Sequence, residues 1–242
     1  MTCDYFGECG SCTLHALDYE AQLEKKLEEN RALFAPFYQA DFDVIRSDSQ
    51  AFRARAEFRL WHDDDGISYA MNNLTKDGMV LIDSCSIVTE PIAILMPKII
   101  ALVKEKRIEF KLFHVDFLST THGETVVSLL YHRKLDDAWR TQAQAIAKEL
   151  DIHIIGRSRK QKVIIGQDFV TESLKINGSI YKFEHIENSF TQPNAKVNEK
   201  MIEWVLKQTA NAQGDLLELY CGAGNFTLPM SKNFTKVLAT EI

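Results

Sequence analysis

The sequence has no long hydrophobic run. Its longest apolar stretches, residues 92–96 and 126–130, are far shorter than the roughly 20 residues that a membrane-spanning helix needs. A basic segment followed by an apolar one, which is typical of a secretory leader, is also missing at the N-terminus. We therefore expect a cytoplasmic protein that contacts no membrane, and nothing in the sequence predicts an obligate protein partner.

The sequence also lacks an excess of positively charged residues. The 242 residues include 28 Lys or Arg and 34 Asp or Glu, for a net charge of −6, which excludes a protein that coats nucleic acid indiscriminately. With 45% hydrophobic and 26% charged residues the composition is globular, so disorder and collagen-like structure are excluded too. Any nucleic-acid site must be local, and the basic residues do cluster, for example at Arg53, Arg55 and Arg59.

Cysteines are few, but their spacing is informative. Cys3, Cys9 and Cys12 lie within ten positions, and Cys85 follows far downstream. A disulfide framework is improbable in an unexported chain of this length. Four thiolates can instead surround a metal centre, and the spacing alone suits zinc and an iron–sulfur cluster equally well.

A basic strand is predicted near the start of the first domain. Residues 52–60 alternate strictly between apolar and charged side chains, which indicates a half-buried strand with all three arginines on its outer face. Turn residues at 63–66 and a further strand at 67–71 complete a hairpin. This hairpin predicts a flat, rigid, basic surface.

The rest of the first part indicates a mixed fold. Strands are expected at residues 110–121 and 125–131, followed by a helix that starts at Asp136. A later hairpin has Asn177-Gly178 as its turn, which is a strong short-range signal. Residues 1–187 are therefore predicted to form an α+β domain rich in antiparallel strand pairs.

The character of the sequence changes after Glu187. A polar segment containing Pro193 reads as a linker, and Asn194 can cap a helix that ends at Gly214. This helix is expected to be buried through Val197, Met201, Trp204 and Val205. A β-α-β unit follows, so residues 188–242 are predicted to be the beginning of an incomplete α/β Rossmann-like domain.

The β-α-β unit carries the pattern of a nucleotide-like cofactor site. Gly222 and Gly224 follow the first strand, where glycines let a ligand approach the backbone and a helix start offers free N–H groups. Glu241 ends the second strand, 17 residues after Gly224, near the spacing of a carboxylate that binds ribose hydroxyls. Because the third glycine of the dinucleotide fingerprint is missing, S-adenosylmethionine is favoured over NAD.

Six blocks of the sequence, in order, resemble the tRNA (uracil-5-)-methyltransferase family: ARAEFRLWH, VVSLLYHRKLDDAWR, IGRSRKQK, ENSFTQPN, GDLLELYCGAGNF and VLATEI. The resemblance runs from about Arg53 to Ile242. It implies methylation of C5 of a uridine in the T-loop of tRNA, with S-adenosylmethionine as the donor. The N-terminal block CDYFGECGSC and Cys85 are instead similar to the cluster-binding cysteines of the related ribosomal-RNA enzymes, which favours a 4Fe-4S cluster over zinc.

The resemblance also implies roles for individual residues. Donor contacts fall on Gln192, Tyr220, Asn225 and Glu241, beside Gly222 and Gly224. The T-arm of tRNA is expected on the arginine strand, with Arg59 matching an RNA-contacting arginine of the family. Phe113 is expected either to stack on a loop base or to be a core aromatic. Phe190 and Gln192 are expected to face the flipped uridine.

Similar enzymes carry a cysteine nucleophile and a glutamate base later in the methyltransferase domain, and neither matches a residue here. The family mechanism adds the cysteine thiolate to C6 of uracil, methylates C5, then removes the C5 proton and releases the enzyme. The resemblance thus indicates a truncated form or fragment, inactive alone. A ribosomal-RNA methyltransferase and a metal-cluster RNA-binding module without catalysis are the alternatives.

Overall fold

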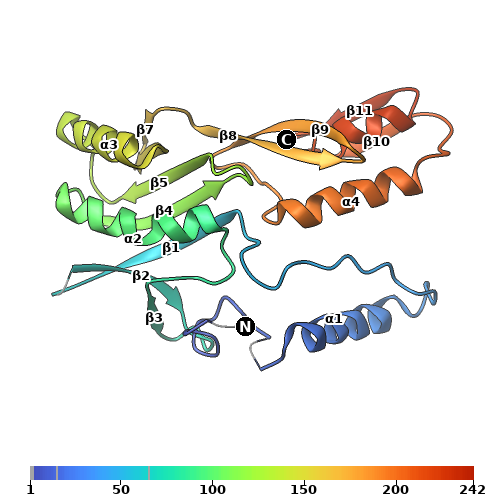
Figure 1. Cartoon of the computed structure of the whole chain (residues 1–242), viewed down its shortest axis with the longest axis horizontal. Helices are drawn as coiled ribbons and strands as arrows, with labels where there is room; N and C mark the ends of the chain where they lie inside the picture. The colour runs from blue at the N-terminus through green and yellow to red at the C-terminus, as the bar shows by residue number, and fades with distance from the viewer. Residues whose placement is uncertain (1–2, 15, 65) are drawn as a thin grey trace.

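The computed structural model describes residues 3–14, 16–64 and 66–242 (Figure 1). Asp65 of the predicted turn lies outside the described residues, as do Met1 and Thr2 of the predicted cysteine segment. No helix in these three ranges is long and apolar enough to cross a membrane.

A seven-stranded sheet forms the centre of the molecule, in the order β3-β2-β1-β4-β5-β6-β7. All neighbouring pairs are antiparallel except β5 and β6, which are parallel. The expected mixed, mostly antiparallel fold is therefore confirmed for this part. The strands are β1 (Arg55–Asp63), β2 (Gly66–Asn72), β3 (Met79–Ile82), β4 (Leu112–Ser119), β5 (Thr125–Tyr131), β6 (His153–Ser158) and β7 (Gln161–Ile165).

Two helices, α2 (Glu90–Glu105) and α3 (Asp137–Leu150), cover one face of the sheet (Figure 1). The Asp136 side chain caps α3 by accepting a hydrogen bond from the Trp139 N–H, as the sequence predicts. Trp139 packs over Gly156 of β6, where a Cβ would lie 2.2 Å from the indole ring. The main core lies between these helices and the alternate strand residues that face them.

The opposite face of the sheet is largely free of covering elements. The base of the hairpin formed by β8 (Phe169–Ile176) and β9 (Ser179–Ile186) packs there, through Val170 against Leu118, Val126 and Ile155. The predicted turn at Asn177 and Gly178 is confirmed, with φ of 47° and 80°.

The far end of this hairpin packs on the C-terminal elements. Leu174, Ile176 and Phe183 share a second core with Ala195 and Ile202 of the next helix. The hairpin therefore contributes to cores on both sides of the predicted domain boundary. The C-terminal elements are α4 (Ala195–Gln208), β10 (Leu216–Leu219), α5 (Thr227–Met230), the 3₁₀ turn η1 (Ser231–Asn233) and β11 (Val237–Thr240).

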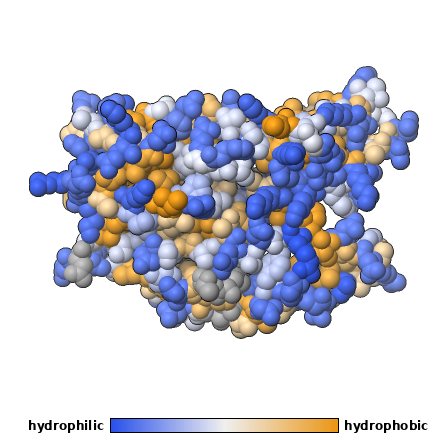
Figure 2. Space-filling view, viewed as in Figure 1, coloured by the Kyte–Doolittle hydropathy of each residue, from blue (hydrophilic) through white to orange (hydrophobic). Residues whose placement is uncertain are grey.

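An extended segment, residues 41–50, runs between α1 (Tyr19–Phe34) and α4 (Figure 1). It is tied to both helices, because Arg46 pairs with Glu20 on one side and Asp43 accepts a hydrogen bond from Trp204 on the other. No residue of α1 is buried. Figure 2 shows hydrophobic surface interrupting the hydrophilic shell at this end of the molecule.

Three expectations about local structure are wrong in detail. The arginine strand begins at Arg55 rather than residue 52, and β1 is an interior strand of the sheet. Helix α4 ends at Gln208, well before Gly214. Its buried residues are Ala195, Asn198 and Ile202, because the helix turns this side to the β8–β9 hairpin, while the predicted Val197, Met201, Trp204 and Val205 are half-buried or exposed.

Candidate functional site: a cysteine cavity, an open sheet face and a glycine loop

The N-terminal loop is fastened to the hairpin of β2 and β3. The Gly10 N–H donates to the Asn72 carbonyl at 2.8 Å, and Cys9 forms an isolated bridge with Asn73. A Cβ on Gly10 would lie 2.5 Å from the Asn73 carbonyl oxygen, so only glycine allows this approach. These contacts hold the loop beside the sheet and bring its cysteines toward Cys85.

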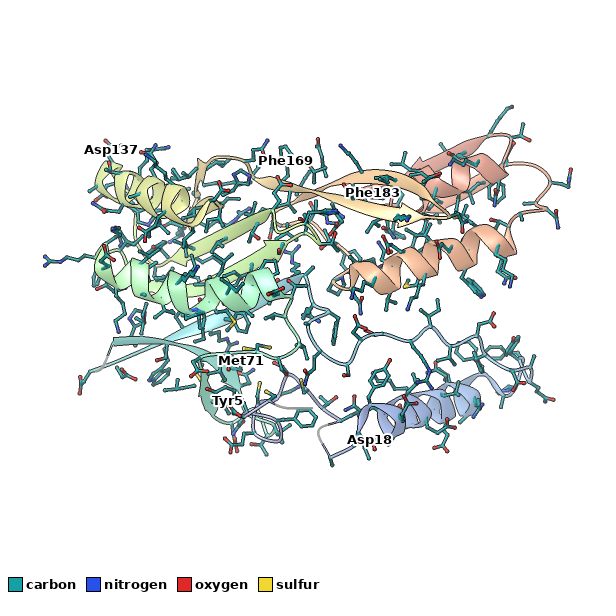
Figure 3. All side chains as sticks on the ribbon, viewed as in Figure 1. Tyr5, Asp18, Met71, Asp137, Phe169 and Phe183 are labelled. Carbon is teal, nitrogen blue, oxygen red and sulfur yellow. The ribbon has the colours of Figure 1, made fainter. Side chains whose placement is uncertain are left out.

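All four predicted cysteines line one cavity of about 360 Å³. Each is a free, half-buried thiol. Figure 3 shows the sulfur atoms gathered near the labelled Met71 and Tyr5, which also line the cavity. Burial and the neighbouring cysteines raise the pKa of the Cys12 thiol, and burial also raises that of Cys85. The structure thus brings together residues that lie 73 positions apart in the sequence, Cys12 and Cys85.

The spread of the sulfur atoms can be compared with what a single metal ion needs. Tetrahedral zinc with bonds of about 2.3 Å would hold all four sulfurs about 3.8 Å apart. Within the described part of the chain, however, the only group of three or more potential ligand atoms lying mutually within 4.8 Å is Glu57, His114 and Asp116. Among the described residues, no three of the four cysteine sulfurs therefore lie mutually within 4.8 Å.

The three arginines of the basic strand have different surroundings. Arg53 precedes β1 and lines the cysteine cavity. The Arg55 guanidinium donates to the Ser189 carbonyl and lies 3.6 Å from the Glu57 carboxylate. Arg59 is exposed and donates to the Asn72 side chain at 3.1 Å. Of the two arginines within β1, Arg59 is therefore the exposed one and Arg55 is half-buried, while Arg53, before the strand, is also exposed.

Arg59 belongs to a row of side chains that crosses the open face. Strand register places His114 opposite Arg59, then Leu130 and Arg157 on the following strands. The carboxylates on this face have partners: Asp116 lies 2.9 Å from His114, and Glu57 is near Arg55. Arg157 is itself paired with Glu187, so Arg59 is the exposed cation of this row.

A stacked pair of rings marks one end of this face. Phe113 of β4 and His132, just after β5, have ring centroids 3.8 Å apart and an interplanar angle of 9°. They line a groove of about 630 Å³ together with Arg133, Lys134 and Arg159. Phe113 is half-buried, so neither a core position nor full exposure describes it. His132 was not predicted, although its place directly before Arg133 and Lys134 in the same block was a usable signal.

The glycine loop lies at the carboxyl ends of two parallel strands. β10 and β11 are paired in parallel, with Leu219 opposite Thr240. Tyr220, Gly222 and Gly224 have φ of 56°, 56° and 78°, and a Cβ on Gly222 would meet nothing within 4 Å. The Glu241 carboxylate accepts a hydrogen bond from the Gly222 N–H at 2.5 Å. The predicted acid and the predicted loop are thus in direct contact.

Asn198 joins α4 to this loop. Its buried amide and the amide of Asn225 exchange two hydrogen bonds, of 2.7 and 2.9 Å. This contact places the first turn of α4, which Gln192 shortly precedes, beside the glycine loop. Asn198 was missed because it follows no cofactor motif; its place one helical turn after the cap residue Asn194 was the only signal.

The linker holds Phe190 outward. Phe190 is 77% exposed, while Gln192 is half-buried. The backbone on either side is fixed, because the Ala54 N–H donates to the Pro193 carbonyl at 2.7 Å and Arg55 donates to Ser189. An exposed aromatic on a fixed backbone, at the junction of the arginine strand and α4, is suited to stack on a base.

The family described as tRNA (Uracil-5-)-methyltransferase matches residues 18–242, nearly the whole chain after the cysteine loop. The chain belongs to this family. The tRNA/tmRNA (uracil-C(5))-methyltransferase of Sulfurimonas denitrificans is 55% identical over 243 residues, covering 100% of this chain and 66% of that protein. The protein of the same description from Aliarcobacter butzleri is 47% identical over 248 residues, with the same coverage.

The chain therefore spans 66% of the length of these relatives. The fold of the family is also found here. The tRNA (uracil-54, C5)-methyltransferase of Pyrococcus abyssi, solved in complex with S-adenosyl-L-homocysteine, aligns with a TM-score of 0.70 at 19% identity. The alignment covers 95% of this chain and 58% of the archaeal one.

Proposed function

We propose that this chain is the RNA-binding and donor-binding part of an enzyme that methylates C5 of a uridine in the T-loop of tRNA, giving 5-methyluridine. The observation that carries the proposal is the family match over residues 18–242. The geometry supports it, because an open sheet face that carries the exposed Arg59 and a glycine loop closed by a carboxylate are joined through a short linker.

Donor binding is proposed for the glycine loop. S-adenosylmethionine supplies an electrophilic methyl group when bound. Glu241 accepts hydrogen bonds, as a ligand of ribose hydroxyls must, and it already lies against the backbone of Gly222. Tyr220, Gly224 and Asn225 flank the same loop, and Gln192 enters from the linker. The positive φ at Gly222 and the free space beside it allow close approach of a ligand.

RNA binding is proposed for the open face of the sheet. Arg59 supplies phosphate contacts, and Phe113 stacked on His132 offers a ring surface for a splayed base. Phe190 lies at the other end of β1, where Arg55 binds the linker, and is proposed to stack on the extruded uridine. Residues of this chain thus bind and orient the RNA, while addition to C6 and proton removal from C5 require the nucleophile and base that similar enzymes carry later.

The four cysteines are proposed to hold a 4Fe-4S cluster. Their convergence on one cavity and the spread of their sulfur atoms support this group over zinc. Protein purified without oxygen should be brown and contain iron and sulfide. Stoichiometric zinc without iron would show that the smaller metal is the native one.

RNA binding can be tested on the 242-residue chain. We expect Arg59→Gln to weaken binding of a T-arm RNA and to lower the slope of log K against log salt by about one, because one phosphate contact is lost. Lys98→Gln is the matched control, since Lys98 is exposed on α2, which covers the other face of the sheet. Equal effects of the two variants would show that the open face is not the RNA site.

Catalysis is tested with labelled S-adenosylmethionine and unmodified RNA. A chain extended through the remaining length of the relatives should methylate tRNA, and the 242-residue chain should not. Methylation of a ribosomal-RNA fragment in place of tRNA would support the related ribosomal enzyme. Activity in the 242-residue chain would contradict the proposed division of roles, and no activity in either chain would support an RNA-binding module.

A further inference from the structure

Arg53 differs from Arg55 and Arg59 in its backbone. It precedes β1 and forms an isolated parallel bridge with Val88. Its N–H donates to the Ile87 carbonyl at 2.8 Å, and its carbonyl accepts from the Thr89 N–H at 3.0 Å. The segment that holds Arg53 therefore begins directly after Cys85, and Arg53 is fixed to the cysteine site rather than to the open sheet.

The Arg53 side chain is placed between two cavities that also share Cys12. One cavity contains all four cysteines, and the other lies between the N-terminal loop, α1 and the extended segment. Arg53 is exposed to solvent in part, and its side chain borders the space that the four thiols surround.

Arg53 also has a free positive charge. Among the described residues its side chain makes no hydrogen bond or ion pair, whereas Arg55, which lines the same cavity, is bound to Ser189 and lies near Glu57. Four thiolates around a divalent zinc or a 4Fe-4S cluster leave a net negative charge. A negative charge in a half-buried cavity is costly unless a cation is near.

We propose that Arg53 is the counter-charge of the metal group held by Cys3, Cys9, Cys12 and Cys85, and is not an RNA contact. The inference rests on the metal site proposed above. It divides the arginines that the sequence places together: Arg53 serves the cysteine site, Arg55 holds the linker, and Arg59 serves the open face. Arg53 acts on the metal group as an outer-shell residue, which tunes retention and reduction potential.

The test compares Arg53→Gln, Arg53→Lys and Arg59→Gln in the 242-residue chain, purified without oxygen or reconstituted with iron and sulfide. We expect Arg53→Gln to lose its metal to a chelator about tenfold faster than the parent, as outer-shell changes do. Its reduction potential should become more negative, because a nearby positive charge favours the reduced group. Arg53→Lys should largely restore both properties, and Arg59→Gln should match the parent.

RNA binding gives the opposite pattern. Metal-loaded Arg53→Gln should bind T-arm RNA with the affinity and salt slope of the parent, whereas Arg59→Gln should not. If Arg53→Gln retained its metal as well as the parent but bound RNA more weakly, the inference would be overturned, and Arg53 would be an RNA contact instead. A parent chain that holds neither iron nor zinc after reconstitution would refute the metal site itself, while leaving the RNA and donor proposals standing.

Discussion

Glu187 is a buried carboxylate that binds side chains of two strands of the sheet, β5 and β6. It is 6% exposed, accepts hydrogen bonds from Arg157 and Ser128, and lies 3.6 Å from Lys162. Burial raises the pKa of this carboxyl, but the bonds from Arg157 and Ser128 and the charges of Arg157 and Lys162 outweigh burial and lower it. The ionised carboxylate is therefore favoured in the folded state.

The lowered pKa of Glu187 predicts a stability that depends on pH. The unfolded chain, with the ordinary value of 4.5, binds the proton more readily than the folded chain. The contribution of ionised Glu187 to the free energy of unfolding is thus complete above about pH 4.5. It is lost as the pH falls through the lower pKa of the folded state. We expect Glu187→Gln to reduce the free energy of unfolding by about 1–3 kcal/mol at pH 7, with a smaller difference from the parent at pH 3.

Urea unfolding at a series of pH values measures this effect. Glu184→Gln is the control, because Glu184 is exposed on β9, three residues before Glu187. A difference between parent and Glu187→Gln that stays constant from pH 7 to pH 3 would contradict the assignment of the shift to this carboxyl.

At the residue scale, the sequence indicates which side chains carry functional chemistry better than it indicates which residues those side chains contact. Cys85 lines one cavity with the three spaced cysteines, and Glu241 contacts the backbone of the glycine loop, while the roles predicted for both stay predictions. Arg53 and Arg59 are equivalent in the alternating pattern, yet one lines the cysteine cavity and the other faces outward. That distinction depends on the segment after Cys85, which is distant in sequence, so local periodicity could not reveal it.

At the scale of elements, the packing of α3 on β6 allows no added atom. A Cβ on Gly156 would lie 2.2 Å from the Trp139 Cη2 and 2.5 Å from Leu135. Both are buried, so Gly156→Ala must displace the helix or the strand. We expect a loss of about 1–3 kcal/mol in the free energy of unfolding, as for overpacked cores.

The cause can be isolated with Trp139→Phe, because phenylalanine lacks the outer indole atoms that the new methyl group meets. In thermal or urea unfolding, the double variant should be less destabilised than the sum of the two single variants. Simple additivity would mean that Gly156 is needed for a reason other than the contact with Trp139.

Elements with strong local signals were predicted closely. The caps at Asp136 and Asn194 and the turn at Asn177 act through adjacent residues, so the sequence alone identifies them. The prediction of the buried face of α4 was wrong. It relied on Trp204, which is large and apolar, but this side chain is 42% exposed and donates a hydrogen bond to Asp43 of the extended segment. Which side of a helix is covered depends on the element that packs there, here the β8–β9 hairpin.

At the scale of the whole molecule, stability should be unevenly distributed. The seven-stranded sheet has a large core, whereas β10 and β11 are strands of four residues that form a separate two-stranded sheet. Leu217, Leu219 and Leu238 are 59%, 60% and 63% exposed, so this ladder buries little apolar surface. Two-stranded pairs of this kind are marginal in water.

Hydrogen exchange of the 242-residue chain should therefore show two classes of strand. Amides of β4 and β5 should exchange slowly, through opening that approaches global unfolding, and those of β10 and β11 should exchange quickly through local opening. The β8–β9 hairpin gives an internal reference, because it shares cores with both the sheet and α4 and should be intermediate. If β10 and β11 are protected as strongly as β4 and β5, the C-terminal elements are stabilised by more than their own pairing, and the glycine loop is already rigid before the donor binds.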